Sequence, residues 1–239
     1  MKLPISYGRQ YISDGDIQAV VETLKSDYLT CGPKIPEFEQ AFCEYVHAKY
    51  SVAVCNATAA LHIAAMALGV KEGDNVICTP MTFASSANCI RFCGGNVKFV
   101  DIDPETYLLD INKLKEILST APKGTYKGMV LVDFAGYPHN MEEYRKVADE
   151  YGMWILEDAC HAPGAYFIDS TGERVYCGCG KYSDITVFSF HPVKHITTGE
   201  GGMACTQNKE YYEKMALYRT HGITHEAEKL QREDGLWYY

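Results

Sequence analysis

Residues 51–80 read SVAVCNATAALHIAAMALGVKEGDNVICTP, and this stretch decides the predicted fold. It opens with a short apolar run, which is typical of a buried strand. An alanine-rich helix is expected at 57–68, closed by Gly69. A second apolar run at 75–79 reads as another strand, which ends at Pro80. The order strand, helix, strand is the building block of a parallel sheet covered by helices.

The same alternation continues along the chain. Its repetition predicts an α/β fold with a mostly parallel central sheet and helices on both faces. Ligands of such sheets bind at the carboxyl ends of strands, so residues that directly follow a strand are the candidates for function. Further strands are expected at 97–101, 127–134, 153–158, 185–190 and 202–205, and further helices at 17–24 with a cap at 13–16, and at 36–47, 84–93, 110–118, 141–151 and 209–218.

The composition excludes several classes of function. Hydrophobic residues make up 47% and charged residues 22%, as in ordinary globular proteins. The net charge of −9 has no basic stripe to offset it, so nucleic-acid binding is not expected. No apolar run approaches the roughly 20 residues that cross a bilayer, and the first residues do not resemble a secretory signal. We therefore expect a cytoplasmic protein that does not enter a membrane.

Ten cysteines are scattered along the chain, and without an export signal they indicate a reducing compartment. Most lie in apolar runs, where free cysteine packs as a small hydrophobe. Cys160, His161, Cys177 and Cys179 form the one group that invites a zinc hypothesis. They lack the second Cys-x2-Cys pair that zinc sites usually have, so we expect no metal.

The densest chemical signal is FSFHPVKHITTGEGG at 188–202. Lys194 follows the apolar end of a predicted strand and precedes a turn rich in threonine and glycine. Apolar surroundings keep part of a lysine neutral and nucleophilic, as Schiff-base chemistry requires. An ordinary solvated lysine is the alternative, and the residues alone predict only an active-site loop.

Three other places follow predicted strands. A carboxylate at Asp158 could pair with the pyridine nitrogen of a cofactor, with His161 near the same ring, although a turn or cap residue is the alternative. At 56–60 (NATAA), the first amides of a helix and the Thr58 hydroxyl suit a phosphate, or the residues simply cap the helix. Phe83 could cover a planar cofactor, although most such phenylalanines belong to a core.

Together these pieces resemble the DegT/DnrJ/EryC1/StrS sugar aminotransferases, a family of fold-type I enzymes that use pyridoxal 5'-phosphate (PLP). The resemblance runs in order through nearly the whole chain. The stretch at 188–202 looks most like that of the enzymes that aminate C4 of a UDP-linked 4-keto-6-deoxy amino sugar on the route to pseudaminic acid. The motifs are DYLTCG at 27–32, NATAAL at 56–61, PMTFASSAN at 80–88, VDID at 100–103, EDACHAPG at 157–164 and the stretch at 188–202.

The resemblance implies a role for each candidate residue. Lys194 would form the Schiff base with PLP and later carry the proton between cofactor and sugar carbon. Asp158 would pair with the pyridine nitrogen, His161 would contact the ring hydroxyl, and Phe83 would stack on the ring. Glutamate would be the amino donor and a nucleotide-linked 4-keto-6-deoxy sugar the acceptor, in a homodimer. The phosphate would be held by Ala57, Thr58 and Ser189.

The resemblance also implies that residues 1–239 form an aspartate-aminotransferase-like large domain with an N-terminal helical segment, without the family's C-terminal small domain. The aromatic end LWYY at 236–239 fits a cut inside an element, so we expect a fragment. Two alternatives stay open: a module that binds PLP or a nucleotide sugar without turnover, and a PLP-dependent sugar dehydratase. The dehydratases of this family have histidine in place of the lysine, and the presence of Lys194 disfavours that alternative.

Overall fold

The computed structural model of the chain describes residues 8–224. The aromatic end at 236–239, on which the expectation of a fragment partly rests, lies outside them. Seven strands form the central sheet: β1 (Tyr50–Val54), β2 (Asn75–Cys78), β3 (Asn96–Phe99), β4 (Tyr126–Val132), β5 (Trp154–Asp158), β8 (Ile185–Ser189) and β9 (Gly202–Thr206).

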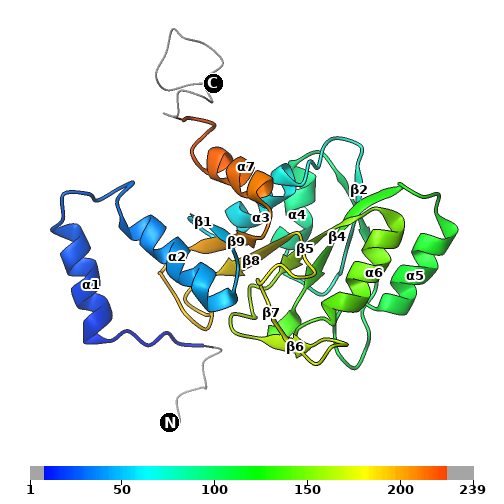
Figure 1. Cartoon of the computed structure of the whole chain (residues 1–239), viewed down its shortest axis with the longest axis horizontal. Helices are drawn as coiled ribbons and strands as arrows, with labels where there is room; N and C mark the ends of the chain where they lie inside the picture. The colour runs from blue at the N-terminus through cyan, green and yellow to red at the C-terminus, as the bar shows by residue number, and fades with distance from the viewer. Residues whose placement is uncertain (1–7, 225–239) are drawn as a thin grey trace, which may run out of the picture.

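The strands follow the order β1-β9-β8-β5-β4-β2-β3 across the sheet (Figure 1). Strand β9 runs antiparallel to both of its neighbours. The remaining neighbouring pairs are parallel. The predicted α/β fold with a mostly parallel sheet is therefore confirmed.

Helices cover both faces of this sheet (Figure 1). Helix α1 begins with the predicted cap, in which the Ser13 hydroxyl accepts a hydrogen bond from the amide of Asp16. Its side chains remain exposed or half-buried, and it lies apart from the sheet. The helices are α1 (Asp14–Leu24), α2 (Lys34–Val46), α3 (Ala57–Ala67), α4 (Ser85–Phe92), α5 (Ile111–Thr120), α6 (Met141–Tyr151) and α7 (Lys209–Arg219).

Alternating side chains of the strands build a core on each face. In β4, Val130 belongs to the core shared with α3, α4 and α7. Met129 and Leu131, one residue to either side, belong to the core shared with α5 and α6. All three are fully buried. Because successive strand residues point to opposite faces, an apolar run such as β4 needs helices on both sides.

Two local features differ from the prediction. Strand β4 ends at Val132 rather than at 134, because the short 3-10 turn η1 (Phe134–Gly136) follows it with Ala135 at φ 54° and Gly136 at φ 85°. A strand cannot continue through left-handed residues. The antiparallel hairpin of β6 (Tyr166–Ile168) and β7 (Arg174–Tyr176) was not predicted, because strands of three residues carry too little periodicity.

Strand β9 shapes the edge of the sheet where the candidate residues lie. The carboxyl ends of β1, β5 and β8 meet at this edge, and the antiparallel β9 starts there. Its first residue, Gly202, pairs with Val54 of β1 and with Ser189 of β8. A Cβ atom on Gly202 would lie 2.5 Å from the carbonyl carbon of Asn56 and 2.6 Å from the nitrogen of Ala57. Only glycine therefore allows β9 to approach the start of α3.

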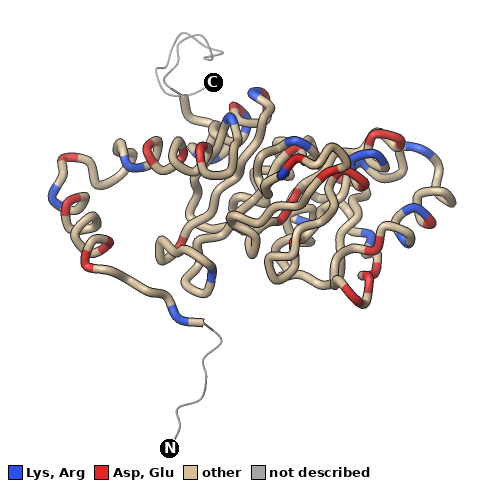
Figure 2. The backbone as a smooth tube through the Cα atoms, turned by 60° about the horizontal axis from the view of Figure 1, so that its bottom comes forward, with Lys and Arg blue, Asp and Glu red and all other residues tan. Residues whose placement is uncertain are grey.

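None of the helices between residues 8 and 224 has the length and apolar character that a membrane crossing needs. Lys and Arg are interspersed with Asp and Glu along this part of the chain (Figure 2).

Candidate active site

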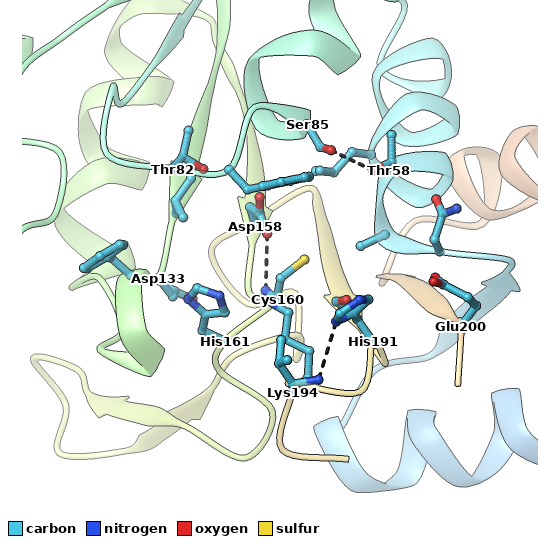
Figure 3. A pocket seen from close by; sticks show the side chains of 18 residues that line it. Thr58, Thr82, Ser85, Asp133, Asp158, Cys160, His161, His191, Lys194 and Glu200 are labelled. Carbon is cyan, nitrogen blue, oxygen red and sulfur yellow. Dashed lines mark hydrogen bonds between the residues drawn. The ribbon is translucent and has the colours of Figure 1, made fainter. Parts of the chain in front are cut away.

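A cavity of about 390 Å³ opens at the carboxyl edge of the sheet. The strands β4, β5 and β8 and the starts of α3 and α4 each contribute residues to its lining. Figure 3 shows Asp158, His161 and Lys194 around the same space, with Thr58 and Ser85 at another side of it. The cavity brings together all the site residues predicted from sequence: Ala57, Thr58, Phe83, Asp158, His161, Ser189 and Lys194.

One side of the cavity offers donors for an anion. The Asn56 side chain caps α3 by accepting a hydrogen bond of 2.8 Å from the amide of Ala59. The two preceding amides, of Ala57 and Thr58, have no partner within the helix. The Thr58 hydroxyl and that of Ser189, at the end of β8, line the cavity beside them. Two amides and two hydroxyls at the positive end of a helix dipole form a suitable phosphate site.

The Asp158 carboxylate ends β5 and is buried beneath the cavity. Its Oδ1 atom accepts a hydrogen bond of 3.2 Å from the amide of Cys160. Its Oδ2 atom accepts one of 2.5 Å from the hydroxyl of Ser86. A carboxylate has about four acceptor positions, so Asp158 can still accept a hydrogen bond from a ring N–H in the cavity.

His161 lies across the cavity from the phosphate side. Its Nδ1 atom accepts a hydrogen bond of 3.3 Å from the amide of Ala135, in the turn η1. Burial, together with the positive charge of Lys194, lowers the pKa of His161 below its usual value of 6.5. The imidazole is therefore neutral at pH 7, and its proton sits on Nε2. That atom can donate a hydrogen bond to a ligand oxygen.

Lys194 is half-buried in the loop that follows β8. Its amide donates a hydrogen bond of 2.8 Å to the carbonyl of His191, which makes a turn at this point. Phe83 is 78% exposed, yet it lines the same cavity. A phenylalanine ring that is this exposed is not part of the hydrophobic core, where most phenylalanines lie.

The sequence reasoning missed the hydroxyl groups at the start of α4 and in the turn before it. Ser85 lines the cavity, and its Oγ atom lies 2.6 Å from Oγ1 of Thr58. Thr82 also lines the cavity, and its Oγ1 atom lies 2.6 Å from Oγ of Ser86. The available signal was the cluster of small hydroxyl residues in PMTFASSAN, directly before the helical period.

The alternative zinc set is not brought together. Among residues 8–224, one group has three metal-ligating side chains with ligand atoms within 4.8 Å of one another, and it consists of Asp133, Glu157 and Cys177. Cys160, His161 and Cys179 are not members. Cys177 instead lies beside the two acids.

Asp133 and Glu157 are buried in a cluster close to the cavity. Burial raises the pKa of Asp133 to about 7. Burial, and next the charge of Asp133, raise the pKa of Glu157 to about 8. The Nδ1 atom of His139 lies 2.9 Å from Oδ1 of Asp133, and burial lowers the pKa of His139 to about 4. At pH 7 the imidazole is neutral and the two carboxyl groups hold at least one proton between them.

A helix start with free amides, a buried carboxylate and a lysine around one cavity form a site suited to a planar ring that bears a phosphate. The fold around it, a mostly parallel sheet with helices on both faces, is that of the large domain of fold-type I PLP enzymes. The chain belongs to the DegT/DnrJ/EryC1/StrS aminotransferase family, whose sequence profile matches residues 10–236.

Relatives with known names support this assignment. The UDP-4-amino-4,6-dideoxy-N-acetyl-beta-L-altrosamine transaminase of Campylobacter jejuni is 41% identical over 220 residues, which are 92% of this chain and 56% of that enzyme. PseC of Helicobacter pylori, an aminotransferase involved in the biosynthesis of pseudoaminic acid, superimposes with a TM-score of 0.83 at 31% identity, over 92% of this chain and 56% of its own. The putative sugar aminotransferase Spr1654 of Streptococcus pneumoniae, solved in its PMP form, gives a TM-score of 0.81 at 28% identity, over 94% and 59%. The chain thus spans little more than half the length of these relatives.

Proposed function

We propose that this chain provides the PLP-binding part of an aminotransferase that moves an amino group from glutamate to a nucleotide-linked 4-keto-6-deoxy sugar. One observation carries the proposal: Lys194, Asp158 and the start of α3 line a single cavity in a chain of a sugar aminotransferase family. The name of the C. jejuni relative supports the sugar substrate, and the PMP form of Spr1654 supports the cofactor.

The cavity fits PLP in size and in chemistry. Its volume of about 390 Å³ lies within the range of small-molecule sites. It offers amides and hydroxyls for a phosphate, a carboxylate for a ring nitrogen, an imidazole for a ring oxygen and an amine for an aldehyde. PLP, when bound, supplies the electron sink that makes the hydrogen on the neighbouring carbon acidic.

Each residue then has a defined task. Lys194 would hold the cofactor covalently through its Nζ atom and, once the amine of the donor has displaced it, would move a proton to or from the carbon that gains or loses the amino group. Asp158 holds the proton on the pyridine nitrogen, and His161 donates from Nε2 to the ring oxygen. Phe83 covers one face of the ring. The phosphate is held by Ala57, Thr58 and Ser189.

The same proposal includes a cytoplasmic homodimer. Large apolar side chains are exposed at the mouth of the cavity, where a second copy of the chain would cover them. They are Phe83 and Val193. The ten cysteines are all free, which suits a reducing compartment.

The experiment is a half-reaction. The PLP-loaded chain is mixed with L-glutamate, and we expect up to one equivalent of 2-oxoglutarate together with a change in the visible absorption of the cofactor. Addition of a UDP-linked 4-keto-6-deoxy sugar should restore the first spectrum. The Lys194→Ala variant is the control and should produce no 2-oxoglutarate. A chain that carries PLP on Lys194 but leaves glutamate unchanged would favour the binding module over the aminotransferase.

A further inference from the structure

Two adjacent serines at the start of α4 contact opposite sides of the cavity. Consecutive residues of a helix point about 100° apart, so neighbours can reach different elements. Ser85 contacts Thr58 on α3, whose first turn forms the phosphate site. Ser86 contacts Asp158 at the end of β5. The first turn of α4 thereby connects the phosphate side of the cavity with the carboxylate side.

Ser86 itself stands behind the site. It is fully buried and does not line the cavity, so it acts through Asp158 rather than on a ligand. Its hydroxyl donates to Oδ2 of Asp158 at 2.5 Å, while the amide of Cys160 donates to Oδ1 at 3.2 Å. Two donors on two different oxygens fix the rotation of the carboxylate and leave its other acceptor positions toward the cavity.

A second hydrogen bond joins Ser86 to Thr82. The Oγ1 atom of Thr82 lies 2.6 Å from Oγ of Ser86. Because Ser86 gives its single hydroxyl hydrogen to Asp158, Thr82 must be the donor of this second bond. The chain Thr82 to Ser86 to Asp158 polarises each hydroxyl toward the acid, which strengthens the hydrogen bond that holds the carboxylate in place.

We infer that Ser86 is a positioning residue for the cofactor: held by its hydrogen bond with Thr82, it keeps the Asp158 carboxylate oriented toward the ring nitrogen. Its neighbour Ser85 orients the Thr58 hydroxyl at the phosphate and has no part in the state of the ring. This inference rests on the proposed function, since it presumes that PLP occupies the cavity.

The two serines should therefore differ in a measurable way. Loss of the Ser86 hydroxyl frees the rotation of the Asp158 carboxylate, which weakens its hydrogen bond to the ring N–H. A less positive ring repels the proton on the nitrogen joined to Lys194 less strongly, so that nitrogen keeps its proton to higher pH. The pH midpoint of the visible absorption change should rise by roughly one pH unit, which is about a tenfold change in the proton affinity of that nitrogen. The loss of one hydrogen bond to a charged group has an effect of about this size.

The test compares four variants with the wild type, each loaded with PLP. Ser86→Ala should raise the midpoint, and Ser86→Thr, which keeps a hydroxyl, should restore it. Thr82→Val should raise it by less. Ser85→Ala is the matched control, which should weaken PLP affinity roughly threefold to tenfold and leave the midpoint unchanged. Thermal unfolding of each apoprotein shows whether it is folded, and Thr82→Val still decides the matter if Ser86→Ala does not fold.

The outcomes separate this inference from the proposed function. A wild-type chain that takes up no PLP on Lys194 overturns both. If the wild-type chain does take up PLP on Lys194, but Ser86→Ala or Thr82→Val titrates at the wild-type midpoint, the role of Ser86 alone is overturned. An equal shift in Ser85→Ala would also overturn it, because the effect would then belong to the whole turn of α4.

Discussion

The pH dependence of folding stability should change when Glu157 is replaced by glutamine. Glu157 is buried, and its Oε2 atom accepts hydrogen bonds from the hydroxyls of Ser183 at 2.8 Å and Thr186 at 2.6 Å. Glutamine keeps an acceptor oxygen for both hydroxyls and can place its amide group toward Asp133. Glu157→Gln therefore removes a titrating proton with little change in volume or bonding.

The sign follows from the direction of each pKa change. Burial and the charge of Asp133 raise the pKa of Glu157 from 4.5 to about 8, so its stabilisation is present below pH 4.5 and lost as the pH rises through about 8. His139 acts in the opposite direction, because burial lowers its pKa from 6.5 to about 4 and its contribution is lost as the pH falls. His139 is present in both proteins, so its contribution cancels when the two are compared from pH 6.5 upward. From there to pH 8 the wild type should lose about 1.4 kcal/mol per pH unit relative to Glu157→Gln, or about 2 kcal/mol in all.

The assay is urea unfolding followed by circular dichroism at pH 6.5 and pH 8.0. The control is Glu116→Gln on α5, where the side chain is exposed and the stability should follow the wild type at both values. Parallel pH dependence of the wild type and Glu157→Gln would refute the account of the buried acids, because Glu157 would then hold the same protons in the folded and unfolded states.

Three further substitutions test the packing around the site. Gly202→Ala should weaken PLP binding by roughly tenfold or more, measured by titration of the visible absorbance of PLP, because the added Cβ would press on the start of α3. Gly15→Ala on exposed α1 is the control and should leave the affinity for PLP unchanged. Phe83→Ala should weaken PLP binding about threefold to tenfold yet change the free energy of unfolding by less than about 0.5 kcal/mol, since this ring is 78% exposed; an unchanged affinity would remove it from the site. Gly128→Ala should destabilise the fold by about 1–3 kcal/mol in urea, because the added methyl group would meet the ring of Trp154, and an unaffected unfolding midpoint would contradict that packing.

The main sheet could be predicted because its strands are apolar runs and its helices carry clear periods. The run at 202–205 predicts a strand but not its direction, since period and composition are the same in either orientation. The antiparallel course of β9 depends on its neighbours β1 and β8, which are distant in the chain. The hairpin of β6 and β7 was missed because each strand has three residues.

The site could be predicted in part for a similar reason. Thr58, Asp158 and Lys194 follow predicted strands, and the topology of a parallel sheet places such residues at one edge. Their chemical roles stay predictions. Ser86 could not be found, because its partner Asp158 lies 72 residues further along the chain and no local pattern encodes that contact. The cluster around Glu157 was missed for the same reason, since its members come from separate elements.

The central claim is that Lys194 holds the cofactor, and borohydride labelling tests it most directly. The purified chain is mixed with PLP, its visible absorption is recorded, the bond is reduced with borohydride, and the modified peptide is mapped by mass spectrometry. The account predicts a yellow protein with one label on Lys194, and no visible band in Lys194→Ala. Labels spread over surface lysines, or a Lys194→Ala variant with the wild-type spectrum, would contradict it.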